Sequence, residues 1–120
     1  MCLPSKFGVE VLLKKLAFVN KLVSVVILAR FSSSRLPGKA LMNIAGKTVL
    51  DHILDRLLRV LPLSSIILAT SDLNSDDALE RFANQRGIAC HRGSLDKVGE
   101  RFYAAARQIG LPYACRLNGD

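Results

Sequence analysis

Residues 25–39 read VVILARFSSSRLPGK, and this stretch decides the fold. It begins with an apolar, mostly β-branched run, the pattern of a strand that is covered on both faces of a parallel sheet. The run stops at Arg30, and a loop with three serines leads to a rigid Pro37-Gly38 turn and to Lys39. Small residues let a backbone approach a phosphate, and arginine and lysine supply charge. The stretch therefore predicts a buried strand that ends in a phosphate-binding loop.

The rest of the chain alternates between strand-like and helix-like segments. Apolar, strand-like runs occur at residues 22–29, 65–70, 88–91 and 113–117. Helical spacing of apolar residues lies between them, over residues 48–61, 74–86 and 94–109. Thr48 and Asp51 have the spacing of a capping box, and Gly87 and Gly110 stand where two helices should stop. Such alternation predicts an α/β fold of three layers, a mostly parallel Rossmann-like sheet with helices on both faces.

Polar residues follow each predicted strand. In open parallel sheets, ligands bind outside the carboxyl ends of the strands, so we expect these residues to converge. They are Arg30, Ser34, Arg35, Gly38 and Lys39 after the first strand, Ser71 and Asp72 after the second, Arg92, Gly93 and Ser94 after the third, and Asp120 after the fourth. The loop after the first strand is neither a Walker loop nor a dinucleotide fingerprint, because GxxxxGK[ST] and GxGxxG are absent. A solvated basic loop is the alternative interpretation.

The net charge of +7 indicates a local anion site rather than a nucleic-acid surface. Between Arg30 and Lys47 the basic residues meet no acidic residue, whereas an acidic patch is expected further along, at Asp72, Asp76, Asp77 and Glu80. The chain has five Phe, two Tyr and no Trp, and they do not alternate with basic residues as a nucleic-acid surface would require. Asp51, Asp55, Arg56 and Arg59 are interpreted as a solvated helix face, and His52 and His91 as surface or structural residues.

Residues 1–22 are predicted to form an amphipathic extension outside the core. Apolar residues recur there at helical spacing, at Val9, Leu12, Leu13, Leu16, Val19 and Leu22. A membrane-surface or partner-docking helix, or a lysine-rich nucleic-acid arm, stays open for this segment. No apolar run reaches membrane-spanning length. Cys2, Cys90 and Cys115 form no close pair, and we expect Cys90 and Cys115 to be buried, in a reducing, cytoplasmic location.

Six segments, taken together, resemble the cytidylyltransferase family, which makes CMP-activated acidic sugars. They are residues 28–30, 34–39, 44–47, 69–72, 92–94 and 116–120. The closest pattern is the spore-coat polysaccharide type. The loop at residues 29–39 is specific to the family, because related sugar-nucleotide pyrophosphorylases and molybdopterin nucleotidyltransferases use a diglycine loop that this sequence lacks. The resemblance implies the nucleotide-diphospho-sugar transferase fold, CTP and a sugar acceptor as partners, and transfer of CMP with release of pyrophosphate for surface polysaccharide biosynthesis.

The resemblance also implies roles for individual residues. Arg30, Ser34, Arg35 and Lys39, in the loop that Gly38 turns, would hold the CTP triphosphate. Ser71-Asp72 and Arg92-Gly93-Ser94 would lie around the cytosine and ribose. Asp120 would bind Mg²⁺ beside the α-phosphate, and Arg30, Lys39 and Asp120 would be the catalytic residues. No general base is identified.

The same resemblance assigns residues 23–120 to the N-terminal, nucleotide-binding half of the family's domain. The family's sugar-binding half and its homodimer contacts lie beyond the position of Asp120. We therefore expect an incomplete chain that binds CTP weakly and does not turn over on its own. A non-catalytic nucleotide- or anion-binding remnant is the alternative function, and GTP or UTP is the alternative nucleotide.

Overall fold

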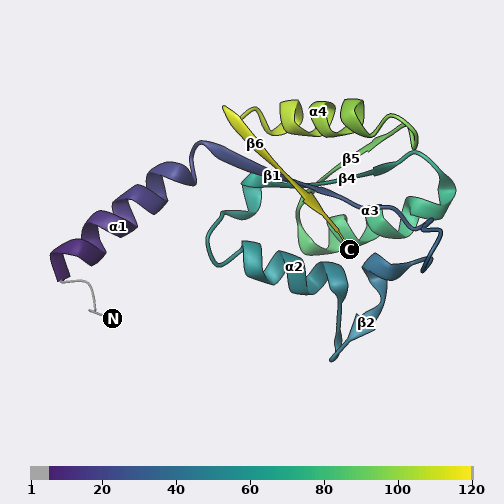
Figure 1. Ribbon diagram of the computed structural model, residues 1–120, viewed down its shortest axis with the longest axis horizontal. Helices are drawn as coiled ribbons and strands as arrows, with labels where there is room; N and C mark the ends of the chain where they lie inside the picture. Colours follow the sequence, from purple (N-terminus) through teal and green to yellow (C-terminus); the bar gives the residue numbers. More distant parts are fainter. Residues whose placement is uncertain (1–5, 120) are drawn as a thin grey trace.

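A computed structural model describes residues 6–119, and its centre is a parallel sheet of four strands. The strands are β1 (Val23–Leu28), β4 (Ile66–Ser71), β5 (Ala89–Gly93) and β6 (Tyr113–Asn118), in the order β5-β4-β1-β6. Helices α2 (Val49–Leu57) and α3 (Asp77–Arg86) lie on one face of the sheet, and α4 (Val98–Ile109) lies on the other (Figure 1). The predicted three-layer α/β fold is confirmed.

The register of the sheet brings the carboxyl ends of its strands to one edge. Leu28 of β1 lies opposite Ala69 of β4 and opposite Asn118 of β6. Ser71, the last residue of β4, lies opposite Gly93, the last residue of β5. The loops that follow all four strands therefore leave the sheet on the same side, as the sequence predicts.

Alternate residues of β1 face two different cores. Val25 and Ile27 belong to the cluster under α2 and α3, and Val26 and Leu28 belong to the cluster under α4. Both faces of β1 are therefore covered, and a strand covered on both faces has no polar side, which explains the continuous apolar run. All six residues of β4 are buried as well.

The helix boundaries confirm most of the predicted signals. Thr48 and Asp51 form a complete capping box at the start of α2, and Gly87 and Gly110 are the C-caps of α3 and α4. Three boundaries differ from the prediction: α2 ends at Leu57 rather than at residue 61, α3 begins at Asp77 rather than at residue 74, and α4 begins at Val98 rather than at Ser94. Arg92 and Gly93 belong to β5, which is longer than expected, because parallel pairing with β4 continues through Gly93.

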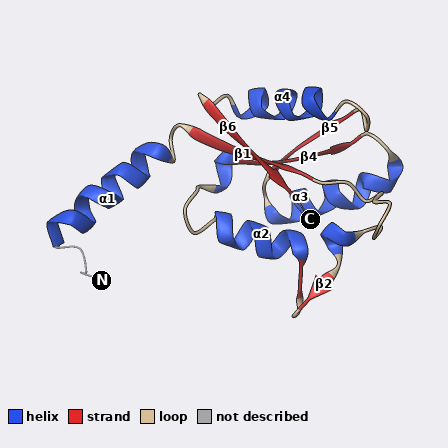
Figure 2. Cartoon of the chain, in the orientation of Figure 1, coloured by secondary structure: helices blue, strands red, loops and turns tan. Residues whose placement is uncertain are grey.

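A hairpin of β2 (Asn43–Ile44) and β3 (Lys47–Thr48) precedes α2, and short 3₁₀ turns lie at η1 (Lys39–Leu41), η2 (Leu63–Ser65) and η3 (Asn74–Asp76). Figure 2 shows the hairpin projecting beyond α2. A ring nitrogen of His52 lies 2.7 Å from the carbonyl oxygen of Ile44, so this histidine ties the hairpin to the helix. The structural role expected for His52 is confirmed.

The solvated face expected on α2 is wrong for two of its four residues. Arg86 of α3 pairs with Asp51 and also with Asp55, at 2.7 Å from the second carboxylate. Lys47 of the hairpin reaches the same Asp55 at 2.7 Å. The two carboxylates therefore join α2 to α3 and to β3. Sequence spacing alone could not reveal this, because the partner arginine lies on another helix.

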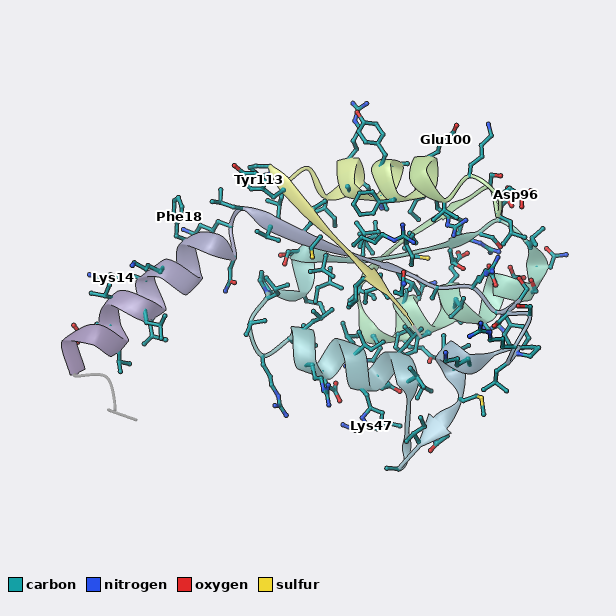
Figure 3. The ribbon with its side chains drawn as sticks, viewed as in Figure 1. Lys14, Phe18, Lys47, Asp96, Glu100 and Tyr113 are labelled. Carbon is teal, nitrogen blue, oxygen red and sulfur yellow. The ribbon has the colours of Figure 1, made fainter. Side chains whose placement is uncertain are left out.

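Helix α1 (Lys6–Val19) extends away from the sheet (Figure 1). Lys14 and Phe18 project from it well clear of the strands (Figure 3), and Phe18 is 65% exposed. The side chains of Leu16 and Val19, and all of Cys2, lie outside the described part of the chain. Within residues 6–119, no helix is long and apolar enough to cross a membrane.

The expectation that both strand cysteines are buried is wrong for Cys115. Cys90 of β5 is half-buried, and burial followed by the charge of Glu80 raises its thiol pKa to about 11. Cys115 lies on β6, which forms one edge of the sheet and exposes most of its side chains.

Candidate nucleotide site

The loop after β1 folds back on itself at Gly38. The backbone N–H of Gly38 donates to the carbonyl oxygen of Phe31 at 2.7 Å, which closes the loop. Gly38 has φ of 73°, in the left-handed region, and a Cβ atom there would lie 2.9 Å from the Phe31 ring. Glycine is therefore required both by the backbone conformation and by the packed ring. Lys39 follows directly, at the start of η1.

A buried carboxylate fixes the start of this loop. Asp76 is fully buried and accepts hydrogen bonds from the backbone N–H of Phe31 at 2.6 Å, from the Thr70 hydroxyl at 2.9 Å and from both the N–H and the hydroxyl of Ser71. Burial alone would raise the pKa of Asp76, but the hydrogen bonds from Ser71, Phe31 and Thr70 together hold it below its ordinary value. The surface role expected for Asp76 in an acidic patch is wrong, and Asp76 instead ties the end of β4 to the residue after Arg30.

A pocket of about 280 Å³ opens where the loops after β1 and β6 diverge. The topology explains its position: α2 and α3 connect strands on one side of β1, whereas α4 returns the chain to the other side, so a crevice opens between β1 and β6. The residues that line it are Leu28, Ala29, Arg30, Ser33, Lys39, Ala40, Val98, Arg101, Arg116, Asn118 and Gly119.

The pocket is strongly cationic. Arg30 and Lys39 come from the loop after β1, Arg101 comes from α4 and Arg116 comes from β6. No acidic side chain is among the described residues that line the pocket. Four cations around one small cavity form a site for an anion that carries several negative charges.

Close contact between the two strand ends at this pocket depends on Gly119. Its N–H donates to the carbonyl oxygen of Leu28 at 2.8 Å. A Cβ atom at this position would lie 2.8 Å from the Cβ of Ala29, closer than two such atoms can pack. The chain after β6 can therefore lie directly against the start of the loop after β1, and Asn118 and Arg116 come to the same cavity as Arg30.

Three of the predicted loop residues do not line this pocket. Ser34 and Arg35 are exposed in the loop, and Gly38 is buried beneath it. Ser33, the neighbour of Ser34, lines the pocket instead. The triphosphate roles of Ser34 and Arg35 stay predictions, and the structure brings Arg30 and Lys39 together as expected.

The residues predicted around the base and ribose have partners within the protein. Arg92 pairs with Asp77 at 2.7 Å and with Glu80 at 2.8 Å, and it also donates to the carbonyl oxygens of Ser71 and Leu73. The hydrogen bonds to Glu80 and Asp77 raise the pKa of Arg92. Arg92 therefore joins β5 to the start of α3.

The other members of this predicted group lie close by. The buried Ser71 hydroxyl donates a hydrogen bond to Asp76, and the Asp72 N–H donates to the Gly93 carbonyl oxygen at 2.9 Å. Ser94 is exposed. Their contacts with a nucleotide stay predictions. Asp120, the predicted metal ligand, lies outside the described residues. Within residues 6–119, no three His, Cys, Asp or Glu side chains come close enough to hold a metal ion.

Sequence reasoning missed Arg101, Arg116 and Asn118 as pocket residues. The signal for Arg101 is present in the sequence: it lies three residues after Val98 and four before Ala105, on the apolar face of α4. A charged residue on such a face is buried unless the helix shifts, and buried charges are rare without a role. Arg116 and Asn118 are two residues apart on β6, so they project from the same face of the strand.

Comparison with known proteins identifies the family. A sequence profile described as Cytidylyltransferase matches residues 24–120. The chain belongs to the cytidylyltransferase family. The matched region includes every element of the sheet except the first residue of β1.

Two curated relatives of this cytidylyltransferase chain have informative names. The 3-deoxy-manno-octulosonate cytidylyltransferase of Escherichia coli is 39% identical over 98 residues, which are 80% of this chain and 38% of that protein. The spore coat polysaccharide biosynthesis protein SpsF of Bacillus subtilis is 32% identical over 99 residues, which are 79% of this chain and 41% of that protein. The chain thus spans about two fifths of the length of these relatives.

Two solved structures share the fold. A cytidylyltransferase from Leptospira borgpetersenii serovar Hardjo-bovis (strain JB197) matches with a TM-score of 0.76 and 33% identity, over 82% of this chain and 41% of that one. A CMP:2-keto-3-deoxy-manno-octonic acid synthetase complexed with CTP matches with a TM-score of 0.63 and 27% identity, over 82% of this chain and 40% of that one.

Proposed function

We propose that the chain binds CTP with its triphosphate in the pocket between β1 and β6, and that this binding serves transfer of CMP to an acidic sugar for surface polysaccharide biosynthesis. The observation that carries the proposal is the cationic pocket at the carboxyl edge of the sheet, lined by Arg30, Lys39, Arg101 and Arg116. A volume of about 280 Å³ is close to the lower end of the range for small-molecule sites, roughly 300–1,000 Å³. Family membership and a CTP-complexed structural relative support the choice of nucleotide.

In the proposed reaction, a sugar hydroxyl oxygen forms a bond to the α-phosphorus of CTP. The bond from that phosphorus to the bridging oxygen breaks, its electron pair leaves with pyrophosphate, and the hydroxyl proton is released. Negative charge grows on the departing pyrophosphate, and Arg30 and Lys39 would stabilise it there. Preorganised cations cost no reorganisation at the moment of reaction, which makes electrostatic stabilisation of this kind effective.

Mg²⁺ belongs to the proposal as a partner of the nucleotide. The described lining of the pocket offers cations, a serine and an Asn side chain but no carboxylate, so the metal would be held mainly by phosphate oxygens of the nucleotide. Asp120 follows Gly119 in sequence, and we propose it as the protein ligand. Bound there, the ion would polarise the α-phosphate.

Nuclear magnetic resonance of the ¹⁵N-labelled chain tests nucleotide binding. CTP with Mg²⁺ should move the amide signals of residues 30–39 and of Asn118 and Gly119, and should do so at lower concentration than UTP or GTP. Unchanged signals in residues 30–39 would contradict the proposal. A response to pyrophosphate equal to that of CTP would favour a non-catalytic anion-binding module instead.

A matched pair of variants tests where the nucleotide lies. Lys39→Gln removes a pocket cation, and we expect it to weaken CTP binding about tenfold or more, since hydrogen bonds to charged groups contribute roughly 1.5–3 kcal/mol. Arg81→Gln removes the same charge from the exposed face of α3, outside the pocket lining, and should change the affinity less than about twofold. Equal losses of CTP affinity in both variants would mean that the net charge of the chain, rather than the position of Lys39 in the pocket, determines the affinity.

A further inference from the structure

Arg101 is a buried arginine without a carboxylate partner. Its side chain comes from the first turns of α4, and the residue is only 4% exposed. No ion pair to Arg101 occurs among residues 6–119, although Arg86 and Arg92, which hold elements together, have two carboxylates each. Taking a cation out of water is costly unless a negative group replaces the water.

The hydrogen bonds of Arg101 leave one edge of its guanidinium unused. Nη1 donates to the carbonyl oxygens of Ser94 at 2.7 Å and Leu95 at 3.0 Å. Nε is buried and has no hydrogen-bond partner in the described protein. The Nε edge of an arginine carries two parallel N–H groups, which match two oxygens of a phosphate or carboxylate. Nη1 therefore holds the loop before α4 through Ser94 and Leu95, whereas Nε has no partner in the described protein. Arg101 is one of the residues that line the pocket.

The charges around Arg101 also leave room for an anion. Burial lowers the pKa of Arg101, Asp76 and Asp72 act in the opposite direction, and the positive charge of Arg30 lowers it further. The Asp76 carboxylate is already saturated by four hydrogen bonds from Phe31, Thr70 and Ser71. Two guanidinium groups therefore repel each other across the pocket, and an anion between them would relieve the repulsion.

We propose that Arg101 binds a phosphate oxyanion of the ligand, which lies between Arg101 on α4 and Arg30 at the end of β1. A polyphosphate suits the site better than a single carboxylate, because four cations line one small cavity. This inference rests on the proposed function for the identity of the ligand as a nucleotide, but not for the class of anion. Arg101 is then a binding residue, kept in the core at a cost in stability.

The experiment follows the Nε–H signal of Arg101 in the ¹⁵N-labelled chain during titration with inorganic pyrophosphate and, separately, with CTP and Mg²⁺. Both ligands should move this signal and protect its proton from exchange with water. Calorimetry on variants accompanies the titration. Arg101→Met keeps the length and removes the charge, and it should weaken pyrophosphate binding about tenfold or more. Arg101→Lys keeps the charge without the planar fork and should lose less affinity than Arg101→Met.

Arg107→Met is the matched control. Arg107 lies on the same helix but is exposed, with its guanidinium 5.8 Å from the centre of the Tyr103 ring, and it is not part of the pocket. This variant should change pyrophosphate affinity less than about twofold. If Arg101→Met fails to fold, the Nε–H signal of the unaltered chain decides the question by itself.

Two outcomes separate this inference from the proposed function. An Arg101 signal that stays unmoved at saturating pyrophosphate, or an Arg101→Met variant that binds pyrophosphate as tightly as the unaltered chain, overturns the role of Arg101, even if CTP moves the amides of residues 30–39. If pyrophosphate moves the Arg101 signal but CTP binds no better than UTP or GTP, the role of Arg101 stands and the assignment of CTP fails.

Discussion

The arginines of this chain fall into two groups with opposite surroundings. Arg86 and Arg92 each contact two carboxylates, and these contacts join α3 to α2 and to β5. Arg30 and Arg101 line the pocket, and neither has an ion pair within the described chain. Burial alone would lower the pKa of Arg86, but hydrogen bonds to its two carboxylates raise it. Hydrogen bonds to carboxylates also raise the pKa of Arg92, whereas burial and the charge of Arg30 lower the pKa of Arg101.

The difference separates the charges that join elements of the fold from the charges that we propose for a ligand. A partly buried arginine that already has carboxylate partners has few donors left for an anion from solution. An arginine kept near other cations without a carboxylate destabilises the folded chain until an anion arrives. Asp76 acts on both members of the second group, because it holds Phe31 beside Arg30 and is also the carboxylate that most strongly favours the charge on Arg101.

The largest effect is expected from Asp76→Asn. The amide of asparagine would replace one of the two carboxylate oxygens with a donor, so the N–H of either Phe31 or Ser71 would lose its acceptor and be left buried and unsatisfied. We expect a loss of about 3 kcal/mol in the free energy of unfolding, measured by urea denaturation. Asp96→Asn is the control, since Asp96 is exposed before α4 (Figure 3) and should change stability by less than about 0.5 kcal/mol. A loss below about 1 kcal/mol for Asp76→Asn would show that the buried network is not the anchor of the loop.

A smaller loss is expected on acidification of the unaltered chain. The pKa values of Asp51, Asp55 and Asp76 are all lowered by folding, from 3.8 to about 2 for Asp55, where hydrogen bonds from Lys47 and Arg86 are the main causes. A lowered carboxyl pKa contributes stability that is present above the unfolded value and disappears as the pH falls through the folded value. The free energy of unfolding should therefore fall between about pH 4 and pH 2.

This acid loss should be smaller than that of Asp76→Asn, because both oxygens of a protonated carboxyl group can still accept a hydrogen bond, whereas the amide nitrogen of asparagine cannot. Asp76→Asn should also show a shallower dependence on pH over the same range, since one of the three shifted carboxylates is gone. An identical slope in the variant and in the unaltered chain would mean that Asp76 does not contribute to the acid transition.

The smallest effect is expected from Lys47→Gln. The lysine pairs with Asp55 at 2.7 Å, but its side chain is 57% exposed and Arg86 still holds the same carboxylate. Exposed pairs contribute little, so thermal or urea unfolding should show a loss below about 1 kcal/mol. A larger loss would mean that Lys47, Asp55 and Arg86 act as one cooperative network rather than as separate pairs.

The sheet and the edge at which the candidate site lies could be predicted from the sequence, because both depend on local signals. The apolar run of β1, the capping box at Thr48 and the Gly38 turn each depend on neighbours within a few residues, and each is confirmed. The meeting of the strand ends followed from the alternation of elements alone. Arg30 and Lys39 could be assigned to the pocket for this reason.

The partners of charged side chains could not be predicted, because they come from distant segments. The hydrogen bond from Phe31 to Asp76 spans 45 residues, and the pair of Arg86 with Asp51 spans 35. In sequence, Asp76 is one of four nearby acidic residues, and only packing decides that it is buried while Asp77 and Glu80 take Arg92. Two local clues went unused: Arg101 on the apolar face of α4, and the two-residue spacing of Arg116 and Asn118 on β6.

One paired measurement tests the separation between structural and ligand-binding arginines most directly. Arg30→Gln and Arg86→Gln remove the same charge from the two groups, and each variant is measured for CTP affinity by calorimetry and for the free energy of unfolding by urea denaturation. We predict that Arg30→Gln loses about tenfold or more in CTP affinity and changes stability by less than about 0.5 kcal/mol, whereas Arg86→Gln loses about 1–2 kcal/mol of stability and changes CTP affinity less than about twofold. CTP binding that is unchanged in Arg30→Gln, or that falls equally in both variants, would contradict this separation of the two groups of arginines.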